Sequence, residues 1–141
     1  MTRDQIKKRL KEDEGFSAQV YLDTKGIPTV GWGHAFFGRE VPRVGAEFTV
    51  EQCERWLDDD IKRAEKDFDS FDFQRLNPIA RGVVVMMLFN LGRSKFAKFR
   101  NLIMALYDHD YAMAALEMLD SKWHREDCPK RAVRLARLMM G

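Results

Sequence analysis

Apolar and polar positions follow two different periods in the first third of the chain. Ile6 and Leu10 stand four residues apart among charged residues, which predicts an amphipathic helix over about residues 2–14, ended by a glycine. The period then changes in VYLDTKGIPTVGWGH, where β-branched and aromatic residues flank a Thr-Lys-Gly turn. This pattern predicts a β-hairpin. Because glycine weakens a strand, Gly31 and Gly33 indicate a close approach of the backbone to another group.

The remaining pattern is helical. Residues 35–48 contain three Gly or Pro breakers and are expected to be irregular, and Thr49 with Gln52 then has the pattern of a capping box. The helix that follows is expected over about residues 49–66. Asn77-Pro78 and Gly92 are start and stop signals around an almost wholly apolar segment, which predicts a buried helix over residues 78–91. Further helices are expected over about residues 94–106, 109–121 and 129–139.

These elements predict a mainly α member of the α+β class, organised as one domain over residues 1–141. A small N-terminal β-hairpin lobe would cover about residues 12–48. A long helix over about 49–66 would connect it to a helical C-terminal lobe of about 67–141, which also takes the N-terminal helix. Two lobes joined in this way leave a cleft, which is a usual place for a site.

Composition narrows the class of protein. The chain has 141 residues, is 45% hydrophobic and 33% charged, and has a net charge of +2. These values suit a soluble globular protein and do not suit a dedicated nucleic-acid binder. No apolar run approaches the length of a membrane span, so stable membrane insertion is not expected. Cys53 and Cys128 lack metal-ligand spacing, and we expect two free thiols.

Candidate chemistry lies in EGFSAQVYLDTKGIPTVGWGH, which contains Glu14, Asp23 and Thr29. Glycosidic bond hydrolysis needs one protonated carboxyl that gives a proton to the leaving oxygen and one ionised carboxylate that activates water. A Glu at a helix end can be partly desolvated and so take the acid role, whereas an Asp in an open turn stays ionised. Each residue is also ordinary in its place, because Glu is common at helix ends, Asp in turns and Thr in strands.

The spacing of Glu14, Asp23 and Thr29 resembles the Glu-Asp-Thr pattern of the phage-type lysozymes, of the T-even kind. The resemblance covers nearly the whole chain. It includes, beside the three residues, Asp13, Gly15, Tyr21, Thr24, Gly26, Gly31, Gly33, His34, Thr49, Phe89, Gly92, Phe99, Asn101, Ser121, Trp123, Pro129, Arg131, Ala132 and Arg134.

This resemblance implies a lysozyme-like fold and a muramidase that cuts the β-1,4 bond between N-acetylmuramic acid and N-acetylglucosamine in peptidoglycan. Glu14 would be the general acid, and Asp23 with Thr29 would position the water. No metal and no cofactor are implied. A structural ion pair between His34 and Asp60 is implied as well, in place of a catalytic histidine.

Four further residues are expected to contact the substrate on the same resemblance. Phe89 and Gly33 would face the sugar, while Leu102 and Glu117 replace small polar groove residues, so that contacts there should differ. The segment between His34 and Thr49 is shorter than in the T-even enzymes, which puts some sugar subsites in doubt.

The biological setting follows from the same comparison. The N-terminus has no apolar segment of a signal peptide, so we expect an endolysin that is made in the host cytoplasm and acts on the wall in the periplasm. It would act as a monomer and depend on a holin-like protein to permeabilise the membrane. Two alternatives remain, a lytic transglycosylase and a non-catalytic protein that binds peptidoglycan.

Overall fold

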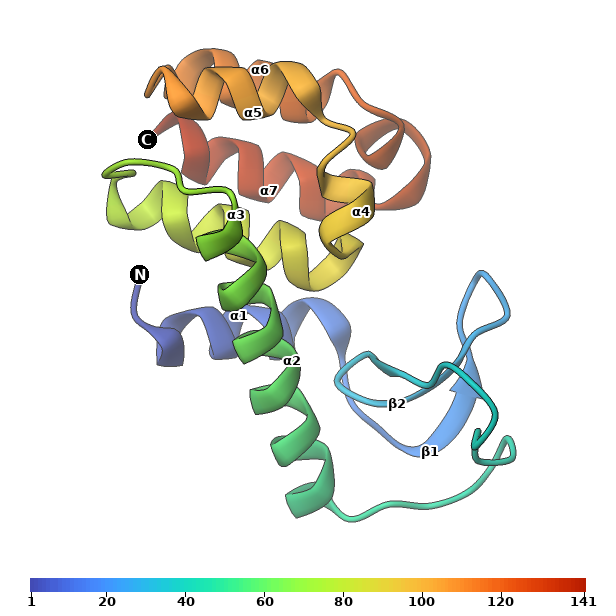
Figure 1. Cartoon of the computed structure of the whole chain (residues 1–141). Helices are drawn as coiled ribbons and strands as arrows, with labels where there is room; N and C mark the ends of the chain where they lie inside the picture. Colours follow the sequence, from blue (N-terminus) through green and yellow to red (C-terminus); the bar gives the residue numbers. More distant parts are fainter. The chain divides into compact units, whose positions relative to one another are not determined.

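The computed structural model describes all 141 residues, and it forms two compact units, which are considered separately (Figure 1). One unit is Arg3–Lys62, and the other is Met1–Thr2 with Arg63–Gly141. Helices together with one small antiparallel sheet confirm the predicted α+β class. The N-terminal helix belongs to the unit that holds the sheet, whereas the sequence-based division groups it with the helical lobe.

The elements of the two units are as follows. The unit with the sheet contains α1 (Arg3–Glu14), β1 (Ser17–Leu22), β2 (Pro28–Gly31), β3 (His34–Ala35) and the first part of α2 (Val50–Ser70). The helical unit contains the rest of α2, α3 (Pro78–Leu91), α4 (Arg93–Phe96), α5 (Arg100–Tyr107), α6 (Tyr111–Leu119), the π-helix η1 (Trp123–Asp127) and α7 (Pro129–Met140).

The sheet is antiparallel in the order β1-β2-β3 and has one irregularity in β1 between Ser17 and Tyr21. The segment after β3, expected to be irregular, pairs in part with β1. The Val20 amide donates to the Ala46 carbonyl at 2.9 Å, and an isolated bridge joins Gln19 to Glu47. This pairing gives β1 a second neighbour, in addition to β2.

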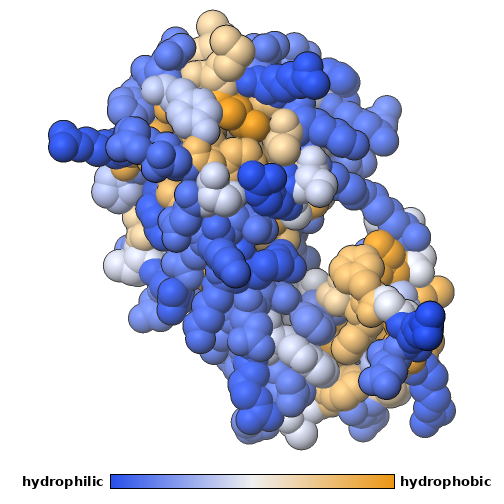
Figure 2. All heavy atoms as spheres, viewed as in Figure 1, coloured by the Kyte–Doolittle hydropathy of each residue, from blue (hydrophilic) through white to orange (hydrophobic).

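The core beside this sheet is small. Val20, Val30 and Cys53 are buried, and partly buried side chains pack around them, namely Trp32, Phe36, Ala46, Phe48 and Trp56. The backbone at Gly31 lies close to Cys53, since a Cβ built at Gly31 would lie 2.9 Å from the Cys53 Cβ. Cys53 and Cys128 are both free thiols, as predicted. Figure 2 shows apolar side chains at the surface around the strands, where Leu22, Phe37 and Val44 are exposed.

An ion network holds α1 to the first part of α2. Lys7 Nζ lies 2.7 Å from Glu54 Oε2 and 2.8 Å from Asp58 Oδ1, and Lys11 also pairs with Glu54. Hydrogen bonds from Lys11 and then Lys7 hold the pKa of the Glu54 carboxyl below its ordinary value of 4.5. Hydrogen bonds to Asp58 and then Glu54 raise the pKa of Lys7 above its ordinary value.

We expect the stabilisation from Glu54 to depend on pH. A carboxyl whose folded pKa is depressed stabilises the protein above its unfolded pKa, and the effect is lost as the pH falls through the folded value. The melting temperature of wild type should therefore exceed that of Glu54→Gln near neutral pH and converge with it below about pH 4.5. Because the side chains are 24–33% exposed, the difference should stay below about 1 kcal/mol. Glu40→Gln, at an exposed loop position, is the control. A wild-type advantage that is unchanged in acid would contradict the prediction.

The helix α3 has the predicted bounds. The Asn77 side chain accepts a hydrogen bond from the Ala80 amide at 2.7 Å, Pro78 occupies the first turn, and Gly92 ends the helix at φ 79°. Its side chains from Val83 to Leu88 are buried, which confirms the expected central helix. The Met1 ammonium group donates to the Pro78 carbonyl at 3.1 Å, so the first two residues join the helical unit.

Two features of the helical unit differ from the prediction. The helix expected over 94–106 is divided into α4 and α5, because Phe99 has a non-helical ψ of 64°. The π-helix η1 was not expected, and its buried Trp123 donates from Nε1 to Asn90 Oδ1 at 2.9 Å. The Cys128 thiol also lies near this oxygen, at 3.8 Å, so Asn90 connects both ends of η1 to α3.

Asn90→Ala should reduce the free energy of unfolding by about 1–3 kcal/mol, because the buried indole N–H of Trp123 would lose its acceptor. Urea denaturation of the wild type, both single variants and the double variant with Trp123→Phe forms a cycle that isolates this contact. The loss should shrink in the Trp123→Phe background. A loss of equal size in both backgrounds would show that the hydrogen bond does not carry the effect.

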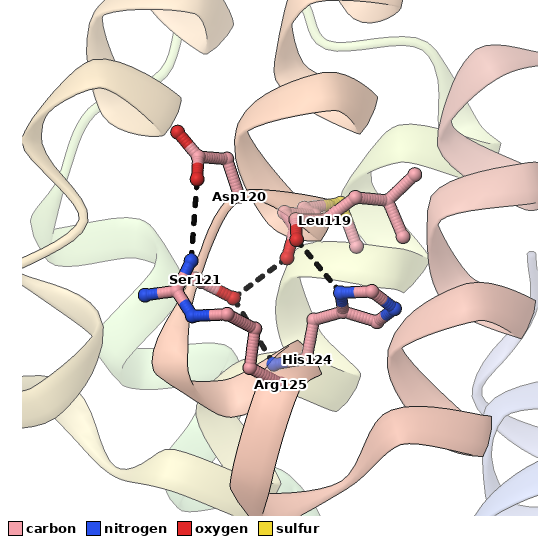
Figure 3. A network of polar contacts seen from close by, with 6 residues as sticks. Leu119, Asp120, Ser121, His124 and Arg125 are labelled. Carbon is pink, nitrogen blue, oxygen red and sulfur yellow. Dashed lines mark hydrogen bonds and ion pairs between the residues drawn. The ribbon is translucent and has the colours of Figure 1, made fainter.

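A polar network joins the end of α6 to η1 (Figure 3). The Ser121 hydroxyl donates to the Met118 carbonyl at 2.7 Å and accepts from the His124 amide at 3.1 Å. His124 Nδ1 lies 2.7 Å from the Leu119 carbonyl, which can only accept, so this nitrogen donates. Arg125 pairs with Asp120 at 3.2 Å. The His124 side chain therefore caps the C-terminal end of α6.

Candidate active site

Asp23 is held by the backbone of the turn that it begins. Its Oδ1 accepts hydrogen bonds from the amides of Lys25 at 2.8 Å and Ile27 at 2.9 Å. Its own amide donates to the Ile27 carbonyl at 3.0 Å, and the Gly26 amide donates to its carbonyl at 2.9 Å. Asp is favoured at such positions because its side chain can bind amides a few residues ahead. The turn thus engages Oδ1 and fixes the orientation of the carboxylate.

Thr29 is fixed by the same turn. Its side chain is only 4% exposed, and Oγ1 donates to the Ile27 carbonyl at 2.8 Å. A hydroxyl has one hydrogen to donate and two lone pairs that accept. Because the hydrogen is committed to Ile27, Thr29 Oγ1 is left as an acceptor. The backbone of Ile27 therefore orients both Asp23 and Thr29. Its amide donates to the Asp23 carboxylate, and its carbonyl accepts from the Asp23 amide and from the Thr29 hydroxyl.

Glu14 ends α1, and its carboxyl group lies against Gly33. A Cβ built at Gly33 would stand 2.6 Å from Glu14 Oε2 and 2.9 Å from Glu14 Cδ. Gly33 also has φ 75°, a conformation that favours glycine. The close backbone approach expected for this glycine is thus an approach to Glu14.

Tyr21 in β1 is a strand neighbour of Thr29. It is directly opposite Thr29 in the β1–β2 ladder and two positions before Asp23. Burial, then the charge of Glu14, then that of Asp23 raise the pKa of the Tyr21 phenol above its ordinary value. The phenol therefore keeps its proton more firmly than an ordinary tyrosine does.

His34 lies in β3 and contacts α2. Its Nδ1 is 2.9 Å from Asp60 Oδ2, and its ring stacks on Trp56 with centroids 4.7 Å apart and planes within 2°. Phe36 makes an edge contact with the same ring, at 5.1 Å between centroids. These three contacts fix the ring within the sheet-bearing unit, in the position of a structural side chain.

The three consecutive aspartates of α2, Asp58, Asp59 and Asp60, do not point to one common site. Asp58 pairs with Lys7, and Asp60 contacts His34. No group of three or more His, Cys, Asp or Glu side chains is arranged to hold a metal ion. None of the helices combines the length and the apolar character needed to span a membrane.

The other residues expected at the substrate lie in the helical unit. Phe89 is 9% exposed in α3, and its carbonyl accepts from Arg63 at 3.4 Å. Leu102 is 1% exposed among core side chains of α5, so contact with a sugar would require that core to open. Glu117 is half-buried in α6.

Ile27 is the residue that sequence reasoning missed. Its contribution comes from the amide and the carbonyl, which every residue other than proline possesses, and its side chain carries no sign of it. The Asp-x-x-x-Ile-x-Thr spacing within a predicted tight turn is the only available signal.

Known proteins match this chain over most of its length. It is 34% identical over 91 residues to the endolysin of Salmonella phage P22, covering 63% of the chain and 62% of the relative. It is 26% identical over 140 residues to the pre-baseplate central spike protein Gp5 of Enterobacteria phage T4, covering 83% of the chain but only 24% of that protein. It is 25% identical over 154 residues to a probable T4-type lysozyme 1 of Dictyostelium discoideum, covering 92% of the chain and 90% of the relative.

The sequence profile described as phage lysozyme matches residues 11–136, a range that includes Glu14, Asp23 and Thr29. This range covers nearly all of both units and contains every element from the end of α1 to most of α7. The chain therefore belongs to the phage lysozyme family.

Proposed function

We propose that this chain is a glycoside hydrolase, a muramidase that cuts the β-1,4 bond between N-acetylmuramic acid and N-acetylglucosamine in peptidoglycan. The observation that carries the proposal is the pair of acceptor oxygens on Asp23 and Thr29, both oriented by Ile27. Membership of the phage lysozyme family and the lysozyme and endolysin names of the relatives support the same reaction.

Asp23 and Thr29 would hold the attacking water. One hydrogen of the water would point to the second carboxylate oxygen of Asp23, and the other to Thr29 Oγ1. An oxygen lone pair of the water would then remain free for attack on the anomeric carbon. Asp23 would accept the proton that the water loses, which is the general-base role in an inverting hydrolysis.

Glu14 would supply the proton for the leaving oxygen. It would begin the reaction protonated, give its proton to the glycosidic oxygen as the bond breaks, and finish as a carboxylate. Its partly buried place against Gly33 supports this role, because burial disfavours the charged form of a carboxyl.

The products separate this proposal from the two alternatives. Peptidoglycan digested by wild type should yield muropeptides with a free reducing N-acetylmuramic acid, as mass spectrometry can show. A lytic transglycosylase would give anhydro products that are lighter by one water. A non-catalytic wall-binding protein would sediment with the wall and release no reducing sugar. Only the reducing products would leave the proposal standing.

The setting in the cell belongs to the same proposal. The enzyme would be made in the host cytoplasm, would act as a monomer, and would reach peptidoglycan in the periplasm after a holin-like protein permeabilises the membrane. The endolysin name of the Salmonella phage P22 relative supports this setting. Expression in cells with and without a separately induced membrane-permeabilising protein tests it, and lysis should require both.

A further inference from the structure

Exposed apolar side chains gather at one end of the small sheet. We use the name hairpin patch for four of them, Leu22, Phe37, Val41 and Val44, whose exposed fractions run from 37% to 76%. Phe37, at 76%, is the most exposed large apolar side chain of the chain. Figure 2 shows apolar side chains at the surface over the strands, with hydrophilic ones at their border. Apolar surface of this kind is typical of a site that contacts a protein or a membrane.

Backbone pairing brings the members of the hairpin patch to the same end of the sheet. Leu22 lies opposite Pro28 in the β1–β2 ladder, and the amide of the residue before Phe37 donates to the Pro28 carbonyl at 2.9 Å. On the other side of β1, the amide of Gly45, the residue after Val44, donates to a carbonyl of this strand at 2.8 Å. The segment that carries the other three members of the patch therefore passes around the end of the sheet at which the hairpin turns.

Two arginines lie in the same segment as the apolar side chains. Arg39 and Arg43 are exposed, and the side chain of neither makes an ion pair or a hydrogen bond. Glu40 is the one acidic residue among them, and the exposed Lys25 adds a further positive charge at the hairpin turn. A guanidinium group pairs with phosphate oxygens through two parallel hydrogen bonds, and its aliphatic stem can lie along apolar surface. The charge of the hairpin patch is therefore complementary to an anionic partner.

The combination of apolar and basic side chains fits the surface of an anionic lipid bilayer. Apolar side chains gain free energy at the boundary between headgroups and acyl chains, while basic side chains are attracted to the lipid phosphates. A second copy of the chain is a poorer partner. A two-fold contact through the hairpin patch would bring Arg39 and Arg43 of both copies together, and like charges at an interface are unfavourable.

We propose that the hairpin patch docks reversibly on anionic phospholipid bilayers, with Phe37 at the acyl boundary and with Arg39 and Arg43 at the lipid phosphates. The contact is one of the protein surface and needs no helix that spans the membrane. This inference goes beyond the proposed hydrolysis and does not depend on it.

Co-sedimentation tests the proposal with vesicles of phosphatidylcholine alone and vesicles of equimolar phosphatidylcholine and phosphatidylglycerol. Wild type should bind the anionic vesicles, and added salt should weaken the binding because it screens exposed charges. Phe37→Ser should lower the partition coefficient by about tenfold. The double variant Arg39→Gln with Arg43→Gln should lower it by roughly 30-fold. Because all three side chains are exposed, both variants should unfold thermally as wild type does.

Matched controls for these variants lie in the helical unit. Met104→Ser removes another exposed apolar side chain, at 62% exposure in α5. The double variant Lys98→Gln with Arg100→Gln removes two other exposed positive charges. Both controls should bind anionic vesicles at close to the wild-type level. Equal binding of wild type to the two kinds of vesicle, or an equal loss in the variants and their controls, would overturn the proposal.

A second measurement locates the contact and separates a membrane from a protein or wall partner. Phe37→Trp places a fluorophore in the hairpin patch, and lipids brominated in their acyl chains should quench it beyond the quenching of the native tryptophans. Met104→Trp, the control, should show no added quenching. Absence of added quenching at position 37, or binding to isolated peptidoglycan that requires Phe37 when vesicle binding does not, would overturn the proposal. Vesicle binding by a chain that fails to hydrolyse peptidoglycan would support it and count against the proposed function alone.

Discussion

Replacing Glu14 by Gln is expected to lower the rate of peptidoglycan hydrolysis by roughly 10²- to 10⁴-fold, the usual contribution of a general acid. The amide matches the carboxyl in size but cannot transfer a proton to the leaving oxygen. Since Glu14 is the last residue of α1, the helix should form as before. The measurements are reducing-sugar release and the fall in turbidity of chloroform-permeabilised Gram-negative cells, with thermal unfolding followed in parallel.

Glu12→Gln is the matched control for Glu14→Gln. Glu12 lies on the same helix, is exposed, and loses the same charge on substitution. This variant should lyse cells at close to the wild-type rate. Retained lysis by Glu14→Gln would rule out Glu14 as the acid, while equal loss in both variants would point to a general effect of charge.

Gly33→Ala is expected to reduce activity by about 100-fold or more, although it changes no acidic residue. The added Cβ would stand 2.6 Å from Glu14 Oε2, so the carboxyl group must move. A displacement of about 1 Å from the reacting geometry can cost about 100-fold in rate. The positive φ of this residue should in addition cost about 1–2 kcal/mol of stability. Activity and urea denaturation of the same preparation measure the two effects.

Gly38→Ala separates strain from displacement. Gly38 also has a positive φ, of 94°, but a Cβ there would meet no atom within 4 Å. It should therefore lose stability while keeping its activity. If both variants lose activity in proportion to their loss of stability, the contact between Gly33 and Glu14 is not what controls the rate.

Local signals in the sequence predict the parts of the fold that depend on local interactions. The bounds of α3 follow from Asn77, Pro78 and Gly92, because each acts on the backbone within a few residues. The division between α4 and α5 does not follow in this way. Phe96 contacts Phe71 at 5.3 Å between centroids, and this packing is specified by residues far away in the sequence. The π-helix η1 likewise makes a hydrogen bond between residues 33 positions apart, from Trp123 to Asn90.

The candidate site likewise has features that the sequence predicts and features that it does not. The spacing of Glu14, Asp23 and Thr29 is visible in the sequence, since it consists of side chains with evident chemistry. The role of Ile27 is not visible, because it is made of backbone atoms. For Gly33 the sequence indicates a close approach but not its partner, which is Glu14. The sugar contact that the resemblance implies for Gly33 stays a prediction.

The backbone role of Ile27 has a consequence for sequence variation. Position 27 should accept many side chains without disturbing Asp23 or Thr29, except proline, which has no amide hydrogen to donate. The hydrogen bonds that orient this pair all close within the turn itself. The turn therefore orients these two side chains through its own backbone. Grafting residues 23–29 onto another tight hairpin should transfer the acceptor oxygens of Asp23 and Thr29 without the rest of the chain.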